Sequence, residues 1–197
     1  MKIRVVLCVC LLSACAAPTG FTEDECRVIA SQGGAIMRLC TTAGRSDSLF
    51  LRREAAALGR GELASDCFRL LKEGMLATVR DTTDAGVGIA APQVGVSRRL
   101  IAVQRFDKPG EPFEFYVNPR IVWRSGTVSD GGEGCLSVPG VAGTVRRADS
   151  IVVSYLDERD MRTLADTVAG FTAVIFQHEI DHLDGVLFID KMLPPGK

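Results

Sequence analysis

Apolar residues recur at helical spacing in several parts of the chain. Between about residues 62 and 80 they return every three or four positions, which is typical of a helix with one face on a core. A longer apolar stripe predicts another helix from about residue 166 or 170 to 183, and residues 46–60 favour a shorter one. Periodicity is weak over residues 16–44, where we expect an irregular start.

The middle of the chain shows short β-rich runs separated by turns. These runs cover residues 100–105, 113–117, 121–124 and 151–156, with turn residues at 108–110, 118–119 and 125–126. Residues 129–143 are rich in glycine, and residues 186–193 indicate a final strand or turn. Helices that flank a block of strands within 197 residues predict one α+β domain, with short antiparallel or mixed strands packed around the last helix.

Composition and charge narrow the class of partner. Hydrophobic residues make up 47% of the chain, which predicts a folded core. The formal net charge is −1, so there is no electrostatic case for a nucleic-acid partner. Two basic pairs, Arg98-Arg99 and Arg146-Arg147, are interpreted as solvated strand ends. We expect a monomer.

The first twenty residues have the layout of a secretory signal peptide. Two basic residues precede an apolar run, Val5 to Leu12, which is too short to span a bilayer. The following Ser13-Ala14-Cys15 completes a sequence similar to a bacterial lipobox, in which the cysteine becomes a lipidated N-terminus. We expect residues 1–14 to be removed and lipidated Cys15 to attach an exported protein to a membrane. The alternatives are a buried N-terminal strand, or a misassigned start codon and a cytoplasmic protein.

Cysteine usage depends on the same leader. Three of the seven cysteines belong to the predicted signal peptide and its lipidation site. Of the four that follow, Cys135 is a candidate metal ligand. An oxidising compartment favours disulfides, so at most one bridge is expected among Cys26, Cys40 and Cys67. The sequence does not select the pair.

The only two histidines stand four residues apart in Gln177-His178-Glu179-Ile180-Asp181-His182. On a helix, positions i and i+4 share a face, so His178 and His182 can bind one ion while Glu179 reaches a bound water as general base. Apolar residues precede them at steps that place the histidines on an inward face, and two unpaired buried imidazoles would be costly. A metal site is therefore a better interpretation than an exposed polar helix.

A catalytic site needs a third ligand. Asp184 and Asp190 are the only acidic residues after His182. Upstream, Cys135 stands among glycines in Glu133-Gly134-Cys135-Leu136-Ser137, and a thiolate is a good ligand for zinc or ferrous iron. A lone cysteine is otherwise more often a small buried hydrophobe.

Three motifs in order resemble those of one family, the peptide deformylases. The family patterns G-x-G-Φ-A-A-x-Q, E-G-C-L-S and Q-H-E-x-D-H are matched by residues 86–93, 133–137 and 177–182. The likeness extends from about residue 62 to 193. We therefore divide the chain into the leader 1–14, a divergent N-terminal segment 15–61 and a catalytic domain 62–197.

The resemblance implies a metal-dependent hydrolase that removes the formyl group from N-formylmethionyl peptides and releases formate. Cys135, His178 and His182 would hold one ion, Fe²⁺ first, with Zn²⁺, Ni²⁺ or Co²⁺ possible. Water on the metal would attack the formyl carbon, with Glu179 as general base. The side-chain amide of Gln93 and the backbone N–H of Leu136 would stabilise the oxyanion. Gly88 and its neighbours would pair with the substrate backbone, beside a methionine pocket walled by Val87, Phe171 and Val174.

Two features set the chain apart from this family. Ala142 stands where an arginine or larger residue is common, which could remove a contact further along the peptide. Deformylation serves nascent chains, yet the leader places the protein across a membrane from ribosomes. Either the start codon is wrong, or the enzyme acts on formylated peptides outside the cytoplasm, or it hydrolyses another small amide there.

Two other functions compete with deformylation. A zinc metallopeptidase of the zincin type shares H-E-x-x-H but takes its third ligand downstream, and leaves the segments around Gln93 and Cys135 unexplained. A non-catalytic lipoprotein with a structural metal would need a fourth protein ligand, and it gives Glu179 no role.

Overall fold

The computed structural model describes residues 20–32, 34–81 and 85–194. The expected signal peptide, residues 1–14, and the lipidation site Cys15 lie outside these ranges. Within them, no helix combines the length and the apolar character needed to cross a membrane.

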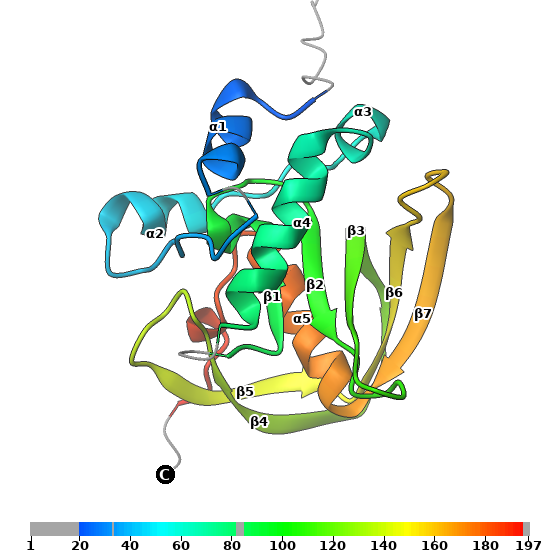
Figure 1. The fold of residues 1–197 in the computed structure, drawn as a ribbon. Helices are drawn as coiled ribbons and strands as arrows, with labels where there is room; N and C mark the ends of the chain where they lie inside the picture. The colour runs from blue at the N-terminus through cyan, green and yellow to red at the C-terminus, as the bar shows by residue number, and fades with distance from the viewer. Residues whose placement is uncertain (1–19, 33, 82–84, 195–197) are drawn as a thin grey trace, which may run out of the picture.

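In the part of the chain that the structure describes, seven strands form two antiparallel sheets. The larger sheet has the order β1-β2-β3-β6-β7 and the smaller pairs β4 with β5. The strands of the larger sheet are β1 Gly88–Ala90, β2 Leu100–Gln104, β3 Phe113–Arg124, β6 Ser150–Leu156 and β7 Thr163–Ala169. The smaller sheet consists of β4 Val128–Gly134 and β5 Ala142–Ala148. Figure 1 shows β4 and β5 curving beneath α5.

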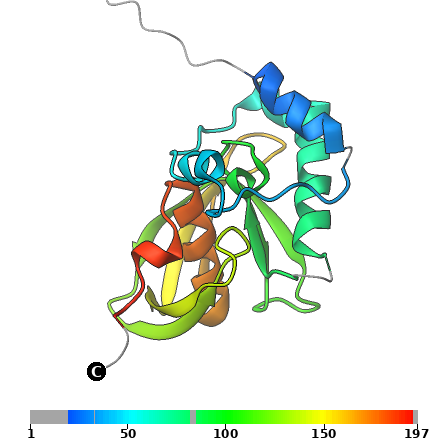
Figure 2. The same cartoon turned by 90° about the vertical axis from the view of Figure 1, so that its left-hand side faces the viewer.

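Helices cover both faces of the larger sheet. The α-helices are α1 Glu23–Gln32, α2 Arg45–Leu51, α3 Arg60–Leu63, α4 Asp66–Val79 and α5 Gly170–Leu183. Two short 3₁₀ helices are η1 Ala91–Val94 and η2 Phe188–Asp190. Figure 2 shows α4 on one side of the sheet and α5 on the other.

The alternation of side chains along β2 explains this arrangement. Leu100 and Ala102 belong to the buried cluster that contains the apolar face of α4. Ile101 and Val103, which point the opposite way, belong to the cluster that contains the apolar residues of α5. A strand whose first four residues are all apolar is therefore buried between two helices. The predicted α+β domain with strands packed around the last helix is confirmed.

Several predicted boundaries were wrong for tertiary reasons. The helix expected over 46–60 ends at Leu51, because the backbone of the next residues bonds to distant segments: Ala55 N–H donates to Leu183 O at 2.8 Å. The helix predicted over 62–80 is divided at Ser65, whose hydroxyl caps α4 by accepting from Phe68 N–H at 3.2 Å. Of the two starts predicted for the last helix, residue 170 is confirmed and residue 166 is not, because β7 continues to Ala169 along β6.

The strand predictions also need correction. The runs 113–117 and 121–124 are one strand, β3, with an irregularity where Asn118 has a φ of 50°. The Asn118 side chain stabilises it by pairing with both backbone groups of Leu58 at 2.8 Å. Much of the glycine-rich stretch 129–143 lies in β4, and residues 188–190 form a 3₁₀ helix.

Residues 20–44 are not the irregular start expected. They contain α1, which a disulfide between Cys26 and Cys67 joins to α4. Cys40 is free and buried, so the expected limit of one bridge among these three cysteines is confirmed and the pair is identified.

The basic pairs were misinterpreted at three of four positions. Arg98, Arg99 and Arg147 are only 4%, 2% and 4% exposed. Arg98 bonds to Glu25 of α1 at 2.8 Å and to buried Glu62 at 3.1 Å. Buried guanidinium groups need such partners. Of the two pairs, only Arg146 is on the surface.

Candidate metal centre

Three side chains from two elements converge beside the smaller sheet. His178 and His182 lie one turn apart on α5, and Cys135 follows the end of β4. Their ligand atoms all lie within 4.8 Å of one another. Cys135 Sγ is 3.2 Å from His182 Nε2. The structure therefore brings together the three residues that the sequence nominated as ligands.

A buried ion-pair network orients His178. Its Nδ1 lies 2.8 Å from Glu133 Oε2, which leaves Nε2 free to face an ion. Arg147 donates to both oxygens of Glu133, at 2.7 and 2.9 Å, and to Asp181 at 2.6 Å. Burial would raise the pKa of Glu133, but the hydrogen bonds from Arg147 and His178 lower it to about 2. A carboxylate on the far nitrogen of a histidine is the usual support of a metal ligand.

When no ion is bound, the pKa values of the two histidines are shifted in opposite directions. Burial would lower the pKa of His178, but hydrogen bonds to Cys135 and Glu133 outweigh it and raise the pKa to about 10. Burial, together with the charge on His178, holds the pKa of His182 well below its usual value. Binding of a cation would release the proton from His178.

Glu179 lies beside these ligands with one carboxylate oxygen unpaired among the described residues. Its side chain is buried, and Oε2 has no hydrogen-bond partner among the described residues. Burial raises the pKa of this carboxyl to about 7. Such a group is suited to accepting and returning protons near neutral pH.

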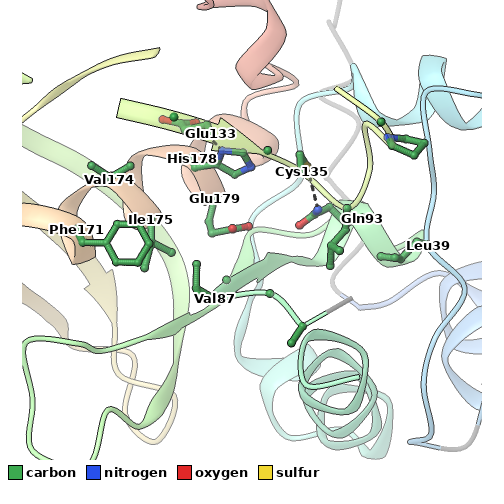
Figure 3. Close-up of a pocket in the computed structure, with 18 residues that line it drawn as sticks. Leu39, Val87, Gln93, Glu133, Cys135, Phe171, Val174, Ile175, His178 and Glu179 are labelled. Atoms are coloured by element: carbon green, nitrogen blue, oxygen red, sulfur yellow. Dashed lines mark hydrogen bonds and ion pairs between the residues drawn. The ribbon is translucent and has the colours of Figure 1, made fainter. Parts of the chain in front are cut away.

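The side-chain amide of Gln93 points at the cysteine. Its Oε1 accepts from the backbone N–H of Ala90 at 2.8 Å, which fixes the orientation of the amide. Nε2 lies 3.5 Å from Cys135 Sγ and 3.2 Å from Ser137 Oγ (Figure 3). The donor is thus preorganised beside the candidate metal ligands.

These groups border one cavity of about 520 Å³. Of the residues that the sequence nominated, all except His182, which is buried behind the wall, line this cavity. Figure 3 shows Phe171, Val174 and Ile175 on one side of Glu179. Phe171 packs against Phe106 at a centroid distance of 5.2 Å, yet it is 56% exposed and sits at the rim.

The donor set fits a divalent cation. One thiolate and two imidazoles match the ligands that zinc and ferrous iron accept, and three protein ligands leave a position open for water or substrate. Glu179 Oε2 is buried beside these ligands without a hydrogen-bond partner among the described residues. Buried polar atoms without partners are rare, so a group bound in the cavity would complete this oxygen.

Sequence reasoning missed the supporting residues. Arg147 and Asp181, which hold Glu133 behind His178, were not nominated. The position of Glu133 beside a candidate ligand, and of Asp181 between the histidines, gave a usable signal. Leu39 also lines the cavity, and its weakly periodic surroundings gave none.

Known proteins share this fold and site region. The family model described as polypeptide deformylase matches residues 45–197, beginning ahead of the residue 62 expected from the motifs. A peptide deformylase of Stenotrophomonas maltophilia is 41% identical over 148 residues, covering 73% of this chain and 82% of that protein. One of Prochlorococcus marinus is 45% identical over 130 residues, which span 64% of this chain and 62% of the relative, less than two thirds of its length.

Solved structures agree with these sequence matches. A class I type b peptide deformylase of Acinetobacter baumannii bound to Met-Ala-Ser has a TM-score of 0.70 at 35% identity, covering 81% of this chain and 99% of that one. The Thermotoga maritima peptide deformylase has a TM-score of 0.69 at 30% identity, with the same coverage of 81% and 99%. The chain therefore belongs to the peptide deformylase family.

Proposed function

We propose that this protein removes the formyl group from N-formylmethionyl peptides and releases formate. One observation carries the proposal: a cysteine–histidine ligand set, the unpaired carboxylate of Glu179 and the oriented amide of Gln93 meet in one cavity. Relatives named peptide deformylase support the reaction, and the Acinetobacter baumannii structure with Met-Ala-Ser supports a peptide of this class.

Cys135, His178 and His182 are proposed to hold one ion. When bound, a divalent cation supplies Lewis-acid activation of water and of the formyl carbonyl. We propose Fe²⁺, with Zn²⁺, Ni²⁺ or Co²⁺ as alternatives, since a thiolate and two imidazoles suit all four.

Glu179 moves the proton in the proposed reaction. Its free oxygen accepts a proton from the attacking water and delivers it to the peptide nitrogen as the C–N bond of the formamide breaks. The water oxygen becomes part of formate, and the methionine leaves with a free amine. The carboxylate is fixed on α5 one residue after His178, so it moves little between the two steps.

Gln93 and Leu136 are proposed to stabilise the developing oxyanion. Ala90 holds the Gln93 amide so that Nε2 faces the reaction centre, and Leu136 follows the candidate ligand Cys135 in the chain. In a site shielded from water, each hydrogen bond to an oxyanion typically lowers the activation barrier by about 3 kcal/mol. The backbone of Gly88 pairs with the substrate, whose methionine side chain contacts Val87, Phe171 and Val174.

We propose that the enzyme is exported, and anchored by lipid on Cys15. Residues 1–14 have the layout of a signal peptide, and the bond between Cys26 and Cys67 suits an oxidising compartment. The substrate is then a formylated peptide outside the cytoplasm. We keep the leader 1–14, the N-terminal segment 15–61 and the catalytic domain 62–197 as the organisation, acting as a monomer without nucleic acid.

The test is formate release from formyl-Met-Ala-Ser by the full-length protein, loaded anaerobically with Fe²⁺. The Glu179→Gln variant should bind the ion but lose turnover. Glu73→Gln, at an exposed glutamate that pairs with Arg69, should keep the activity of the parent. Absence of formate from a fully metallated parent, or undiminished turnover by Glu179→Gln, would refute the proposal.

A zincin-type peptidase has less support. It requires a third ligand downstream of His182, whereas the group of close ligand atoms among the described residues takes Cys135 from upstream.

A further inference from the structure

The catalytic cavity extends beyond the metal residues on the side away from Phe171. In Figure 3, Leu39 lies next to Gln93 on the opposite side of Glu179 from Phe171 and Val174. The charged lining residues Glu133, His178 and Glu179 all belong to the metal end. Three other lining residues, Leu39, Gly86 and Leu136, carry no charge, and we call them the Leu39 end. One contact within it is indicated at Gly86, where an added Cβ would lie 3.5 Å from Leu136 Cδ1.

Leu39 comes from a part of the chain that the family model does not match. That match begins at residue 45. The segment around Leu39 is nevertheless tied to the site on both sides. Met37 N–H donates to Thr78 Oγ1 of α4 at 2.8 Å.

Two backbone hydrogen bonds join the segment around Leu39 to the residues of the candidate site. Cys40 N–H donates to Gln93 O at 2.8 Å, and Thr42 N–H donates to Ser137 O, also at 2.8 Å. Met37 and Cys40 are buried at 3% and 2% exposure, whereas Leu39 is partly exposed to the cavity. The position of Leu39 is therefore fixed relative to Gln93 and to the turn that carries Leu136.

The two ends of the cavity indicate how a bound peptide would place its side chains. If the methionine side chain contacts Phe171 and Val174, the next side chain of an extended peptide points the opposite way. The Leu39 end then receives it. A charged side chain there would lose water against Leu39 and Leu136, and neither of these two residues offers it a charged partner, whereas an apolar side chain would gain contact with both.

We propose that Leu39 is a specificity-determining residue, which selects an uncharged apolar side chain at the position that follows formylmethionine. The proposal rests on the function proposed above and adds a substrate preference to it. It also gives the N-terminal segment a role in substrate recognition.

The experiment compares kcat/KM for formyl-Met-Leu-Ser, formyl-Met-Glu-Ser and formyl-Met-Lys-Ser. The parent, full-length and loaded with Fe²⁺, should prefer the leucine peptide by about tenfold or more, the scale of discrimination in an apolar pocket. Leu39→Lys should shift the preference toward the glutamate peptide, and Leu39→Glu toward the lysine peptide. Opposite shifts from two charges at one position are not produced by a general loss of folding.

Ile36 offers a matched control on the same segment. It is 55% exposed and does not line the cavity, so Ile36→Lys and Ile36→Glu should leave the ratios of the three peptides unchanged. Leu39→Ser serves as an uncharged variant if the charged ones are unstable, and it should reduce the preference for leucine.

The two proposals fail in different ways. Equal ratios of the three peptides for parent and Leu39 variants, with turnover intact, would overturn the role of Leu39 and leave deformylation standing. If the parent hydrolyses none of the three peptides and not formyl-Met-Ala-Ser, the proposed function fails and this inference fails with it.

Discussion

Glu179 Oε1 lies 2.6 Å from the point where a Cβ atom on Gly88 would stand. Ile175 Cγ2 is 2.8 Å from the same point. Strand β1 therefore passes α5 at a distance that only glycine permits. The two elements cannot easily move apart. All three residues of β1 pair with β2, and α5 packs between the two sheets. The carboxylate is confined by the backbone that faces it.

The Gly88→Ala variant should therefore lose activity. The new methyl group must displace the Glu179 side chain, and a displacement of about 1 Å near a reacting group can cost about 100-fold in rate. Binding of Fe²⁺ should persist, because the three atoms nearest to the new methyl group belong to Glu179 and Ile175 and not to a ligand residue. Gly131→Ala is the matched control, since an added Cβ there meets nothing within 4 Å. Formate release and metal content of both variants give the answer, and full activity in Gly88→Ala would contradict the role given to this contact.

Arg147 should be required for both stability and metal affinity. Replacement by methionine leaves the buried carboxylates of Glu133 and Asp181 without their shared partner, which typically costs about 3–5 kcal/mol. Because Glu133 orients His178, metal affinity should fall about 10–100-fold. Urea unfolding and competition with a chelator measure the two effects.

The neighbouring arginine provides the control for Arg147. Arg146 pairs with Asp130 on the surface, where the two side chains are 55% and 40% exposed. Arg146→Met should leave the free energy of unfolding almost unchanged, because solvent screens an exposed ion pair. Equal effects at the two positions would mean that the buried network contributes no more than an exposed ion pair.

The candidate site was more predictable from sequence than the fold that holds it. Ligand chemistry is local: two histidines on one helical turn and a cysteine among glycines indicate a metal directly. The nominated residues Gln93, Cys135 and His178 do meet, because Gln93 lies in η1, Cys135 follows β4 and His178 lies in α5, and all three elements pack together. The order of the strands in the sheet did not follow from periodicity.

The failures share a physical cause. Arg98 and Arg147 were interpreted as solvated because arginine usually is, yet each is buried by carboxylates distant in the sequence. Helix α1 buries only Ile29 of its ten residues, and a disulfide to Cys67 and an ion pair to Arg98 attach it as well. Interactions of this kind leave little trace in a local pattern.

The disulfide should contribute measurably to stability. It links Cys26 to Cys67 across 41 positions of sequence. Closing a loop of that size lowers the conformational entropy of the unfolded chain, which stabilises the folded state by about 3–4 kcal/mol. The double variant Cys26→Ser/Cys67→Ser should lose about that much free energy of unfolding. Reductant should lower the stability of the parent toward that of the variant and leave the variant unchanged. A parent that is as stable as the double variant and insensitive to reductant would show that the disulfide contributes nothing to stability.

Acid should weaken the fold through the pair formed by Asp107 and Arg105. Hydrogen bonds from Arg105, at 2.8 and 2.6 Å, lower the pKa of Asp107 from 3.8 to about 2. A carboxyl whose pKa is depressed on folding stabilises the protein above its unfolded pKa, and that contribution is lost as the pH falls through the folded value. Because the Asp107 side chain is 32% exposed, solvent screening reduces the contribution to about 1 kcal/mol.

The Asp107→Asn variant isolates this contribution. The parent should be more stable than the variant by about 1 kcal/mol above pH 4, and the difference should narrow as the pH falls toward 2. Urea unfolding at a series of pH values measures both proteins over the same range. If the difference stays constant across that window, the stabilisation comes from packing or neutral hydrogen bonds, and the charge on Asp107 contributes little.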